Sequence, residues 1–357
     1  MKKITSFVAD NKSYEAWLKT QCAVVKKDLA YKHERMKLDA FTFLRTTFFR
    51  WAGTIESLCP ALKHATALPA VGDVHLENFG TWRDGEGRLI WGVNDFDEAT
   101  VMPYAFDLLR LATSVQLAPE MPIGNREAAA AIIGGYRRGL HQPRPTMLDE
   151  QETWMRPLVA CSDADRRQFW QEIEALPPAK PPGAVVKLLK RSLPSGASHL
   201  RFAARRKGAG GLGRPRYVVS AEWQGGRILR EARALVPSAW DWAHGVSDPR
   251  SRFLELAAGR HRAPDPTLEV RQHFILRRIA PDSRKVELSD GAGRKVTAAL
   301  LEAMGFDLGA IHAASGSKHR AVLRDLDSRP PDWLREATKA AVAAVTEDFE
   351  AWKASRP

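Results

Sequence analysis

Residues 71–97 read VGDVHLENFGTWRDGEGRLIWGVNDFD, and the organisation of the rest of the chain can be inferred from them. They contain two acidic segments, residues 72–78 (GDVHLEN) and 94–98 (NDFDE). Between them, Asp84-Gly85 is a turn signal, and residues 88–93 (RLIWGV) are typical of a β-strand. The sequence therefore predicts a β-hairpin with one acidic segment before its first strand and another after its second.

The predicted hairpin would bring Asp73, Asn78 and Asp95 to one end of the same small sheet. Three oxygen-bearing side chains in one place can hold Mg²⁺ and leave one carboxylate free to act as a base. Asp and Asn also cap loops, and any one of these residues alone is explained in that way. The combination of D-x-x-x-x-N with a following strand and D-F-D favours phosphotransferase chemistry over loop capping.

The composition is typical of a soluble globular protein that binds anions. With 357 residues, the chain is long enough for two lobes, each with its own core. Its hydrophobic content of 44% and charged content of 27% are ordinary. The formal charge of +12 favours nucleotides, phosphorylated substrates, nucleic acid or acidic lipid as partners, and charge alone does not choose among them.

The cysteines and the first residues of the chain indicate a cytoplasmic protein. Three scattered cysteines, Cys22, Cys59 and Cys161, lack metal-binding spacing and are expected to be reduced thiols. Residues 1–17 contain Asp10 before any long apolar run, which is unlike a signal peptide. No apolar stretch approaches the roughly 20 residues that span a bilayer, so no membrane partner is expected.

Apolar side chains at helical spacing predict several buried helices. The stripes are Leu18, Cys22, Val25 and Leu29; Phe41, Leu44, Phe48, Trp51 and Ile55; Leu108, Leu111, Ala112 and Val115; Leu301, Met304, Leu308 and Ile311; and Val342, Val345, Phe349 and Trp352. The second stripe should pack under the loop that carries Asp73. Asp107 should favour the amino terminus of the third helix. Residues 251–260, which include Glu255, predict a short helix, and residues 270–279 predict a strand.

The sequence changes character at residues 177–183 (PPAKPPG), which cannot form a helix or a central strand. Beyond this boundary, residues 208–213 (GAGGLG) have the spacing G-x-G-x-x-G, and strand-like sequence follows at 217–219 and 228–229. A dinucleotide-binding motif of this spacing needs a strand before it and a helix after it. The following strand predicts instead a glycine-rich hairpin that covers nucleotide phosphates, with Arg230 as the cation for the α- and β-phosphates.

Several segments resemble the bacterial domain-of-unknown-function 2252 family. They are Arg35-Met36 and residues 41–45 (FTFLR), 72–80 (GDVHLENFG), 94–98 (NDFDE), 106–111 (FDLLRL), 208–213 (GAGGLG), 230–232 (REA) and 310–315 (AIHAAS). The resemblance spans residues 35–315 and is most specific around Asp73 and Asp95. This family is similar in turn to aminoglycoside phosphotransferases and other protein-kinase-like enzymes, whose G-D-x-H-x-x-N motif and second acidic motif these segments resemble.

The resemblance implies a role for individual residues of the two acidic segments. Asp73 would be the catalytic base, and His75 would shape the catalytic loop around it. Asn78 and Asp95 would be Mg²⁺ ligands, with Asp97 as a further ligand.

The resemblance also implies supporting and ATP-binding residues. Asp107 would brace the catalytic loop from the following helix, and Glu255 would hold the phosphate-binding cation, Arg230. The glycines that would cover the phosphates of ATP are Gly208, Gly210 and Gly213.

The implied fold is α+β, of the protein-kinase-like two-lobed type, in circularly permuted order because the catalytic loop precedes the glycine-rich segment. The expected division is a helical catalytic lobe at residues 1–183, a smaller β-rich nucleotide-binding lobe at 184–285, and carboxy-terminal helices at 286–357 that return to the helical lobe. The family pattern has Lys where this chain has Arg230 and Gly where it has Thr46. Arginine keeps the charge but presents a rigid fork, so the change from Lys is not conservative.

Three functions are compatible with these features. The first is an ATP- and Mg²⁺-dependent phosphotransferase that acts on a hydroxyl of an unidentified substrate, for example a small molecule; its catalytically weak counterpart would be a nucleotide-binding pseudokinase. The second is a metallophosphoesterase, because residues 72–75 (GDVH) also begin dinuclear phosphatase sites, although the G-N-H and G-H-x-H contexts of such sites are missing from the sequence. The third is a nucleic-acid-binding module, suggested by a basic cluster that attraction of a triphosphate explains equally well. The cluster consists of Arg201, Arg205, Arg206, Lys207, Arg214 and Arg216.

The kinase-like interpretation makes a specific geometric prediction. Residues 208–213 should form a hairpin tip that faces Asp95 across a cleft, with Arg230 pointing into the cleft. Glu255 should lie within salt-bridge reach of Arg230, or swing there when nucleotide binds, because lids of ligand-free kinases are often open. The alternative makes this segment an exposed linker and pairs Arg230 with a surface acid.

Overall fold

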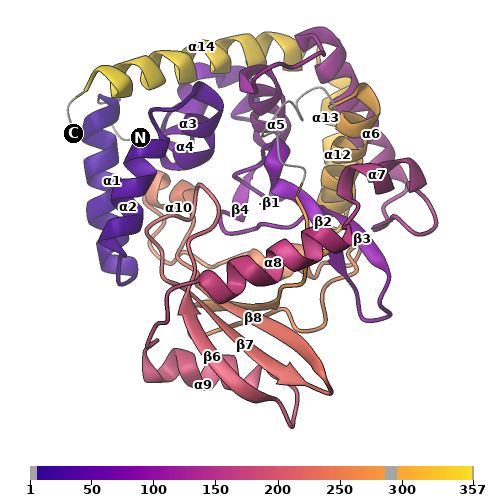
Figure 1. Ribbon diagram of the computed structural model, residues 1–357. Coiled ribbons are helices and arrows are strands. Elements are labelled where there is room, and N and C mark those ends of the chain that lie inside the picture. The colour runs from indigo at the N-terminus through magenta and orange to yellow at the C-terminus, as the bar shows by residue number, and fades with distance from the viewer. Residues whose placement is uncertain (1–5, 286–295, 356–357) are drawn as a thin grey trace.

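The computed structural model describes residues 6–285 and 296–355 and shows a mixed α+β fold. A large helical part lies on one side, and a five-stranded antiparallel sheet with one long covering helix on each face lies on the other (Figure 1).

Helices occur along the whole described chain, with strands between some of them. The α-helices are α1 (Phe7–Gln21), α2 (Lys26–Arg35), α3 (Ala40–Thr46), α4 (Phe48–Leu58), α5 (Ala105–Leu117), α6 (Asn125–His141), α7 (Arg156–Val159), α8 (Asp163–Ala175), α9 (Gly183–Arg191), α10 (Ala239–His244), α11 (Phe253–Ala257), α12 (Ala298–Ala313), α13 (Lys318–Ser328) and α14 (Trp333–Ala354). Short 3₁₀ helices are η1 (Pro60–Leu62), η2 (Leu76–Asn78) and η3 (Thr153–Met155).

The strands form three sheets with the orders β1-β4, β2-β3-β5 and β6-β7-β8-β10-β9. Their bounds are β1 (Ala67–Ala70), β2 (Phe79–Arg83), β3 (Leu89–Val93), β4 (Thr100–Pro103), β5 (Thr146–Met147), β6 (Ser198–Ala204), β7 (Arg216–Trp223), β8 (Gly226–Ala234), β9 (Glu269–Arg271) and β10 (Phe274–Arg278).

The hairpin predicted at Asp84-Gly85 is present as β2 and β3. The two strands are antiparallel, with Phe79 opposite Val93 and Arg83 opposite Leu89. The Asp84 carboxylate closes the turn by accepting hydrogen bonds from the backbone N–H groups of residues 86 and 88. This register places both acidic segments at the same end of the hairpin, as the turn position alone predicted.

The two faces of the five-stranded sheet have different environments because side chains alternate along a strand. Helix α9 packs on one face, where Leu189 meets Val219 and Ala232. Helix α8 and the segment just after it pack on the other, where Ile173 meets Val218. Neighbouring residues of β8 therefore point to opposite sides of the sheet.

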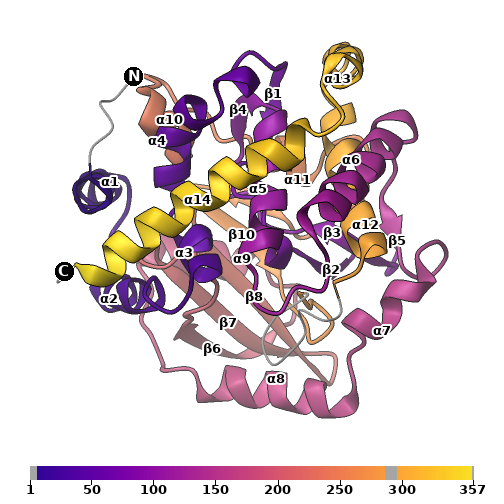
Figure 2. The same cartoon turned by 90° about the horizontal axis from the view of Figure 1, so that it is seen from above.

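The largest core joins segments from both ends of the chain. Helix α12 packs along α6, and α14 crosses α1, α3, α4 and α5 (Figure 2). Arg50 on α4 binds Asp348 on α14 and Asp10 on α1, with N–O distances of 2.7 and 2.6 Å. Residues 235–257, which follow β8, also pack in this core rather than on the five-stranded sheet.

Some predicted elements are divided in the structure. The first apolar stripe spans α1 and α2, with Cys22 and Val25 in the connection between them, and the second spans α3 and α4. The strand predicted at 270–279 is the β9–β10 hairpin, turned by Gln272 and His273 with φ of 48° and 61°. Periodicity predicted most of the buried residues, although Cys22, Val25, Val342 and Val345 are only half-buried, and the short interruptions leave no clear mark on it.

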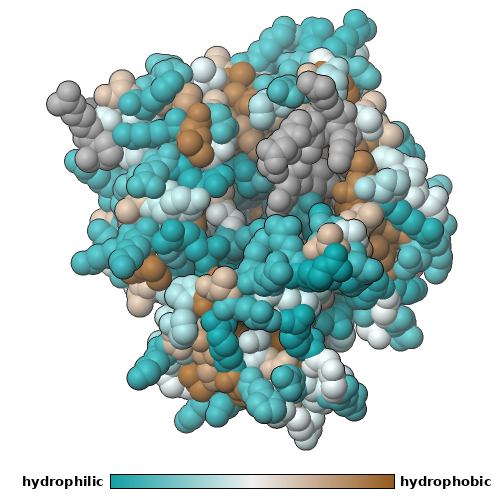
Figure 3. Space-filling model, in the orientation of Figure 1, coloured by the Kyte–Doolittle hydropathy of each residue, from teal (hydrophilic) through white to brown (hydrophobic). Residues whose placement is uncertain are grey.

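The surface is mainly hydrophilic on the face shown in Figure 3. The large apolar side chains that are exposed, such as Leu38 and Trp154, come from separate elements. Within residues 6–285 and 296–355, none of the helices has the length and apolar character needed to cross a membrane.

Candidate functional site

Asp73 lies in the loop between β1 and η2 and is held by a buried arginine. Arg110, on α5, donates from Nε and Nη2 to Asp73 Oδ1, at 2.8 and 2.5 Å. Arg110 is fully buried, and it also donates to the carbonyl of Leu44. Burial raises the pKa of Asp73, and the positive charge of Arg110 opposes that rise. The second carboxylate oxygen of Asp73 is left for another partner.

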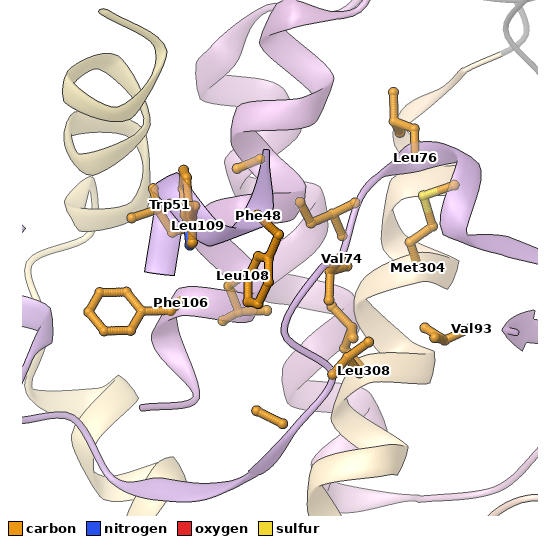
Figure 4. Packing of buried hydrophobic residues seen from close by; sticks show 14 of the residues in the cluster. Phe48, Trp51, Val74, Leu76, Val93, Phe106, Leu108, Leu109, Met304 and Leu308 are labelled. Atoms are coloured by element: carbon orange, nitrogen blue, oxygen red, sulfur yellow. The ribbon is translucent and has the colours of Figure 1, made fainter. Parts of the chain in front are cut away.

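The loop around Asp73 is fixed by apolar contacts on one side. Val74 and Leu76 are fully buried in the core to which α5 and α12 contribute Leu108, Met304 and Leu308 (Figure 4). The core contacts of Val74 and Leu76 therefore hold the loop on either side of His75.

Asp107 fixes the same loop through its backbone. Its carboxylate accepts hydrogen bonds from the N–H groups of Val71 and Gly72, at 2.8 and 2.9 Å. Its Oδ2 also contacts Nε2 of His312, whose Nδ1 contacts the hydroxyl of Tyr136. The amino-terminal end of α5 thus holds the loop, and α6 and α12 hold the carboxylate in turn.

Asn78 connects the two acidic segments. Its side-chain amide donates to the carbonyls of Asp73 and Asp95, at 3.0 and 3.2 Å, and Asn94 N–H donates to the carbonyl of Asn78. The hairpin therefore brings Asp73, Asn78 and Asp95 together as the sequence indicated. Since the amide nitrogen is used, the amide oxygen of Asn78 is the atom available to a cation.

Arg233, on β8, bridges the two carboxylates of the second acidic segment. Nη1 and Nη2 donate to the two oxygens of Asp95 at 3.0 and 3.1 Å, and Nη2 also donates to Asp97 at 2.5 Å. Burial acts to raise the pKa of Asp95, but Arg233 and the nearby Lys285 hold it well below its usual range. Burial raises the pKa of Asp97 to about 7, with Asp95 adding to the rise and Arg233 opposing it.

Glu98 ties the same segment to the rest of the molecule. It accepts a hydrogen bond from Nη2 of Arg214 at 2.6 Å and another from the N–H of Ala239 at the start of α10. Arg214 also contacts Asp97, at 3.6 Å, and the hydroxyl of Tyr14. Two arginines and three carboxylates thus form one buried network.

The glycine-rich segment 208–213 is the connection between β6 and β7, and it covers Asp73. A Cβ atom at Gly210 would lie 3.1 Å from Asp73 Oδ2 and 3.1 Å from the carbonyl oxygen of Arg45. A Cβ atom at Gly211 would lie 3.9 Å from Asp97 Oδ2. Gly208 and Gly213, with φ of 85° and 95°, adopt the left-handed backbone that favours glycine.

The same segment is anchored to the amino-terminal helices. The carbonyl of Gly213 accepts a hydrogen bond from Val25, and Arg206 donates to Asp28 on α2. Ala209 and Leu212 are buried. The alternative of an exposed linker does not describe this segment.

Arg230 and Glu255 occupy other places than the sequence predicted. Arg230 lies on the α9 side of the sheet, where Nε donates to the carbonyl of Ser192 at 3.0 Å. Glu255 pairs with Arg252, three residues before it, at 2.7 Å. The expected pair is not formed because Arg230 faces α9, whereas Glu255 lies on α11, which packs in the large core.

His75 is a neutral, buried histidine. Burial and the charges of Arg45 and Lys285 lower its pKa well below the usual value. Arg45 itself pairs with Glu77 at 2.5 Å. Within the described part of the chain, Nδ1 of His75 is buried without a hydrogen-bond partner.

A cleft of about 500 Å³ lies beside this network. Its walls come from α8, from β2, from the segment after β3, from the α8 face of the five-stranded sheet, and from residues 262–285. Its lining includes aromatic side chains, among them Trp82, Phe96 and Phe253, and cationic side chains, among them Arg205, Arg277 and Lys285.

Arg110 and Arg233 were not among the predicted site residues, and Arg214 was named only as a member of the basic cluster. Arg110 had a local signal, since it stands one helical turn after Asp107 and must face the same loop. Arg214 and Arg233 had none, because their partners lie more than a hundred positions earlier in the chain.

The oxygen atoms of Asn78, Asp95 and Asp97 are the kind that Mg²⁺ prefers. Within residues 6–285 and 296–355, no three His, Cys, Asp or Glu side chains form a cluster able to hold a metal ion. A magnesium site here would therefore consist of two carboxylates and an amide. The guanidinium of Arg233 lies between the two carboxylates, which shows that they accept a shared positive charge.

Comparison with known proteins supports part of the resemblance seen in the sequence. Neither the curated proteins nor the solved structures include a significant match to this chain. The family model that matches is described as an uncharacterized protein conserved in bacteria, DUF2252, and it covers residues 24–173. The part of the chain that carries Asp73, Asn78, Asp95 and Asp107 is thus similar to the bacterial DUF2252 family.

Proposed function

We propose that this protein is an ATP- and Mg²⁺-dependent phosphotransferase that transfers a phosphoryl group to a hydroxyl of its substrate. The observation that carries the proposal is the position of the glycine-rich loop, directly over Asp73 and beside Asp97. A glycine-rich hairpin placed over a carboxylate base and a pair of acidic ligands is the combination that kinase-type phosphoryl transfer requires.

Asp73 is the residue suited to act as the base. Arg110 holds one of its oxygens, which fixes the direction of the other. The raised pKa of the Asp73 carboxyl makes it a better proton acceptor than an exposed aspartate. An acceptor hydroxyl bound next to Oδ2 would donate its proton there, and for that the loop at Gly210 would have to move aside.

The cleft offers the two environments that a nucleotide needs. Aromatic side chains such as Trp82 and Phe253 suit a planar base, and cations such as Arg277 and Lys285 suit phosphates. Because Lys285 and Arg277 interact electrostatically with Asp95, phosphates bound to these cations would lie near Asp95.

Asn78, Asp95 and Asp97 are the residues that would hold Mg²⁺. When bound, Mg²⁺ would neutralise charge on the transferred phosphoryl group. Arg233 would leave the two carboxylates and contact the phosphates instead.

The order of strands supports a kinase-like nucleotide lobe in a permuted chain. The glycine-rich loop joins the first two strands of the sheet, and the third strand, β8, carries a cation directed at the acidic segment. Kinase-type enzymes place their phosphate-binding lysine on the third strand after the same loop. In this chain, the residue in that role is Arg233.

A second candidate is a protein that binds nucleotide without transferring phosphate. The contact of Arg233 with both Asp95 and Asp97 favours it, because an arginine that stays there would keep a metal ion out. A nucleic-acid-binding surface is less well supported, since much of the basic cluster is used in internal contacts, with Arg206 on Asp28 and Arg214 on Glu98.

The test is ATP consumption with Mg²⁺ in the presence of pooled metabolites that carry hydroxyl groups. The products should be ADP and a phosphorylated metabolite, whereas AMP and pyrophosphate would indicate nucleotidyl transfer. Asp73→Asn serves as the control. ATP binding by calorimetry without any turnover across the pools would favour the second candidate.

A further inference from the structure

Glu231, on β8, is fully buried and surrounded by arginines from three neighbouring segments of the sheet. Arg277 on β10 donates from Nε and Nη2 to Glu231 Oε1, at 3.0 and 2.8 Å. Arg205, at the start of the glycine-rich loop, donates to Oε2 at 3.1 Å, and Arg216 on β7 lies 3.6 Å from the same oxygen. One carboxylate therefore holds three guanidinium groups.

Glu231 alone does not balance the charge of the three arginines around it. Three guanidinium groups around one carboxylate leave an excess of two positive charges. Arg233, on the same face of β8, does not add to it, because its own charge is used by Asp95 and Asp97. Burial and the neighbouring arginine charges lower the pKa of Arg216 to about 10, although Glu231 opposes this. Buried cations in such excess call for an anion.

The excess charge is open to the cleft. Arg205 and Arg277 keep 13% and 24% of their side-chain surface exposed, and both line the cleft. Lys285 lines it as well, and burial lowers the Lys285 pKa to about 8. Glu231 itself, with no exposed surface, can hold these side chains in place but cannot meet a ligand.

We infer that Arg205, Arg277 and Lys285 form a polyphosphate-binding site in the cleft. Glu231 is the residue that positions Arg205 and Arg277 within this site. This inference rests on the proposed function for the identity of the ligand as a nucleoside triphosphate. The anion site itself rests on the charge excess and its exposure to the cleft.

The chemistry of the site selects polyphosphate over a single small anion. Guanidinium groups bind phosphate oxygens through paired hydrogen bonds, and a buried carboxylate that fixes them lowers the cost of ordering. The three cations come from the connection between β6 and β7, from β10 and from the segment after β10, and all three line the cleft. An extended anion can contact all of them at once.

Arg230 provides a matched control. It is a buried arginine on β8 like Arg233, but it lies on the opposite face of the sheet, against Ser192 at the end of α9. The sequence pattern favours Arg230 as the phosphate-binding cation, whereas the structure favours the face that carries Glu231.

The experiment is calorimetric titration of the full chain with inorganic tripolyphosphate in the absence of Mg²⁺. Arg277→Gln should weaken binding by roughly tenfold to a hundredfold, the loss of one charge-assisted contact. Arg230→Gln should change it less than twofold. Lys285→Gln, which leaves Glu231 and its arginines intact, should also weaken binding by about tenfold and keeps the test available if Arg277→Gln fails to fold.

Several outcomes would overturn the inference. They are no binding of tripolyphosphate by the wild type, an equal loss in Arg277→Gln and Arg230→Gln, or unchanged affinity in Lys285→Gln. The inference and the proposed function can fail separately. Tripolyphosphate binding that depends on Arg277, without phosphoryl transfer, would retain the site and reject the enzyme. Transfer from ATP that survives in Arg277→Gln and Lys285→Gln would retain the enzyme and reject the site.

Discussion

Arg233 and Asp95 form a two-pronged ion pair that joins the five-stranded sheet to the loop after β3, with N–O distances of 3.0 and 3.1 Å. The guanidinium is almost completely buried, and it also bonds to Asp97. Two parts of the molecule that are far apart in sequence are thus held together by a charge network at the candidate site. Breaking that network should affect stability and function in different ways.

Arg233→Gln should destabilise the ligand-free protein by about 3–5 kcal/mol, because it leaves two largely buried carboxylates without their shared cation. Urea unfolding measures this free energy. Arg227→Gln is the matched control, since Arg227 is on the same strand but pairs with Glu174 in an exposed position. It should cost at most about 1 kcal/mol. Equal effects of the two substitutions would mean that the Arg233 network contributes no more than a surface pair.

Asp95→Asn should abolish Mg²⁺-dependent ATP binding, because it removes the carboxylate with the lowest pKa from the proposed metal ligands. The ligand-free stability should change less than in Arg233→Gln, since Arg233 keeps its bond to Asp97. Calorimetry with and without Mg²⁺ measures the first effect, and thermal unfolding the second. Unchanged Mg²⁺ dependence would assign Asp95 a purely structural role.

Asp73→Asn should keep ATP affinity and lose transfer. The amide oxygen of Asn can still accept the hydrogen bonds of Arg110, so the loop should stay in place, but the amide cannot take a proton from the acceptor hydroxyl. Single-turnover transfer and ATP calorimetry on the same preparation separate the two effects. Transfer at the wild-type rate would remove Asp73 from the chemistry.

Gly210→Ala should disturb the closed loop, because the new methyl group would lie 3.1 Å from both Asp73 Oδ2 and the carbonyl oxygen of Arg45. The loop would have to lift, at a cost of about 1–3 kcal/mol. Hydrogen exchange of residues 205–215 measures the lifting. Gly211→Ala is the control, since the nearest atom to its methyl group would be at an ordinary 3.7 Å. Faster exchange in Gly211→Ala than in Gly210→Ala would contradict the observed packing.

His75 should make stability depend on pH. Its folded pKa is lowered well below the value of 6.5, so the stabilisation is fully present above pH 6.5 and is lost as the pH falls through the folded pKa. The unfolding free energy of the wild type, minus that of His75→Gln, should decrease below pH 6.5 by up to about 1.4 kcal/mol per pH unit. Taking this difference removes the opposite contribution of Asp97, whose pKa is raised to about 7. A difference that stays constant between pH 6.5 and 5 would show that His75 titrates normally.

Interactions between residues close together in the chain were enough to predict the hairpins of this protein. The turn at Asp84-Gly85 and the strand that follows it fix the β2–β3 hairpin, and the hairpin brings Asp73, Asn78 and Asp95 to one end. The strand-like residues that follow the glycines of 208–213 likewise indicated a hairpin loop between strands. These signals are readable because turn chemistry and side-chain alternation act over a few residues.

Only the tertiary structure decided which cations face the site. Arg230 and Arg233 stand on the same strand with the same charge, and a shift of one residue in the strand exchanges the face that each points to. Packing of α9 against Val219 and Ala232 fixed that choice, and it turned Arg230 away and Arg233 toward Asp95. The positions of Arg214 and Arg277 depend in the same way on how distant segments meet. Burial of apolar side chains selects such contacts, and because that force is non-directional, no short stretch of sequence records which charged partners it brings together.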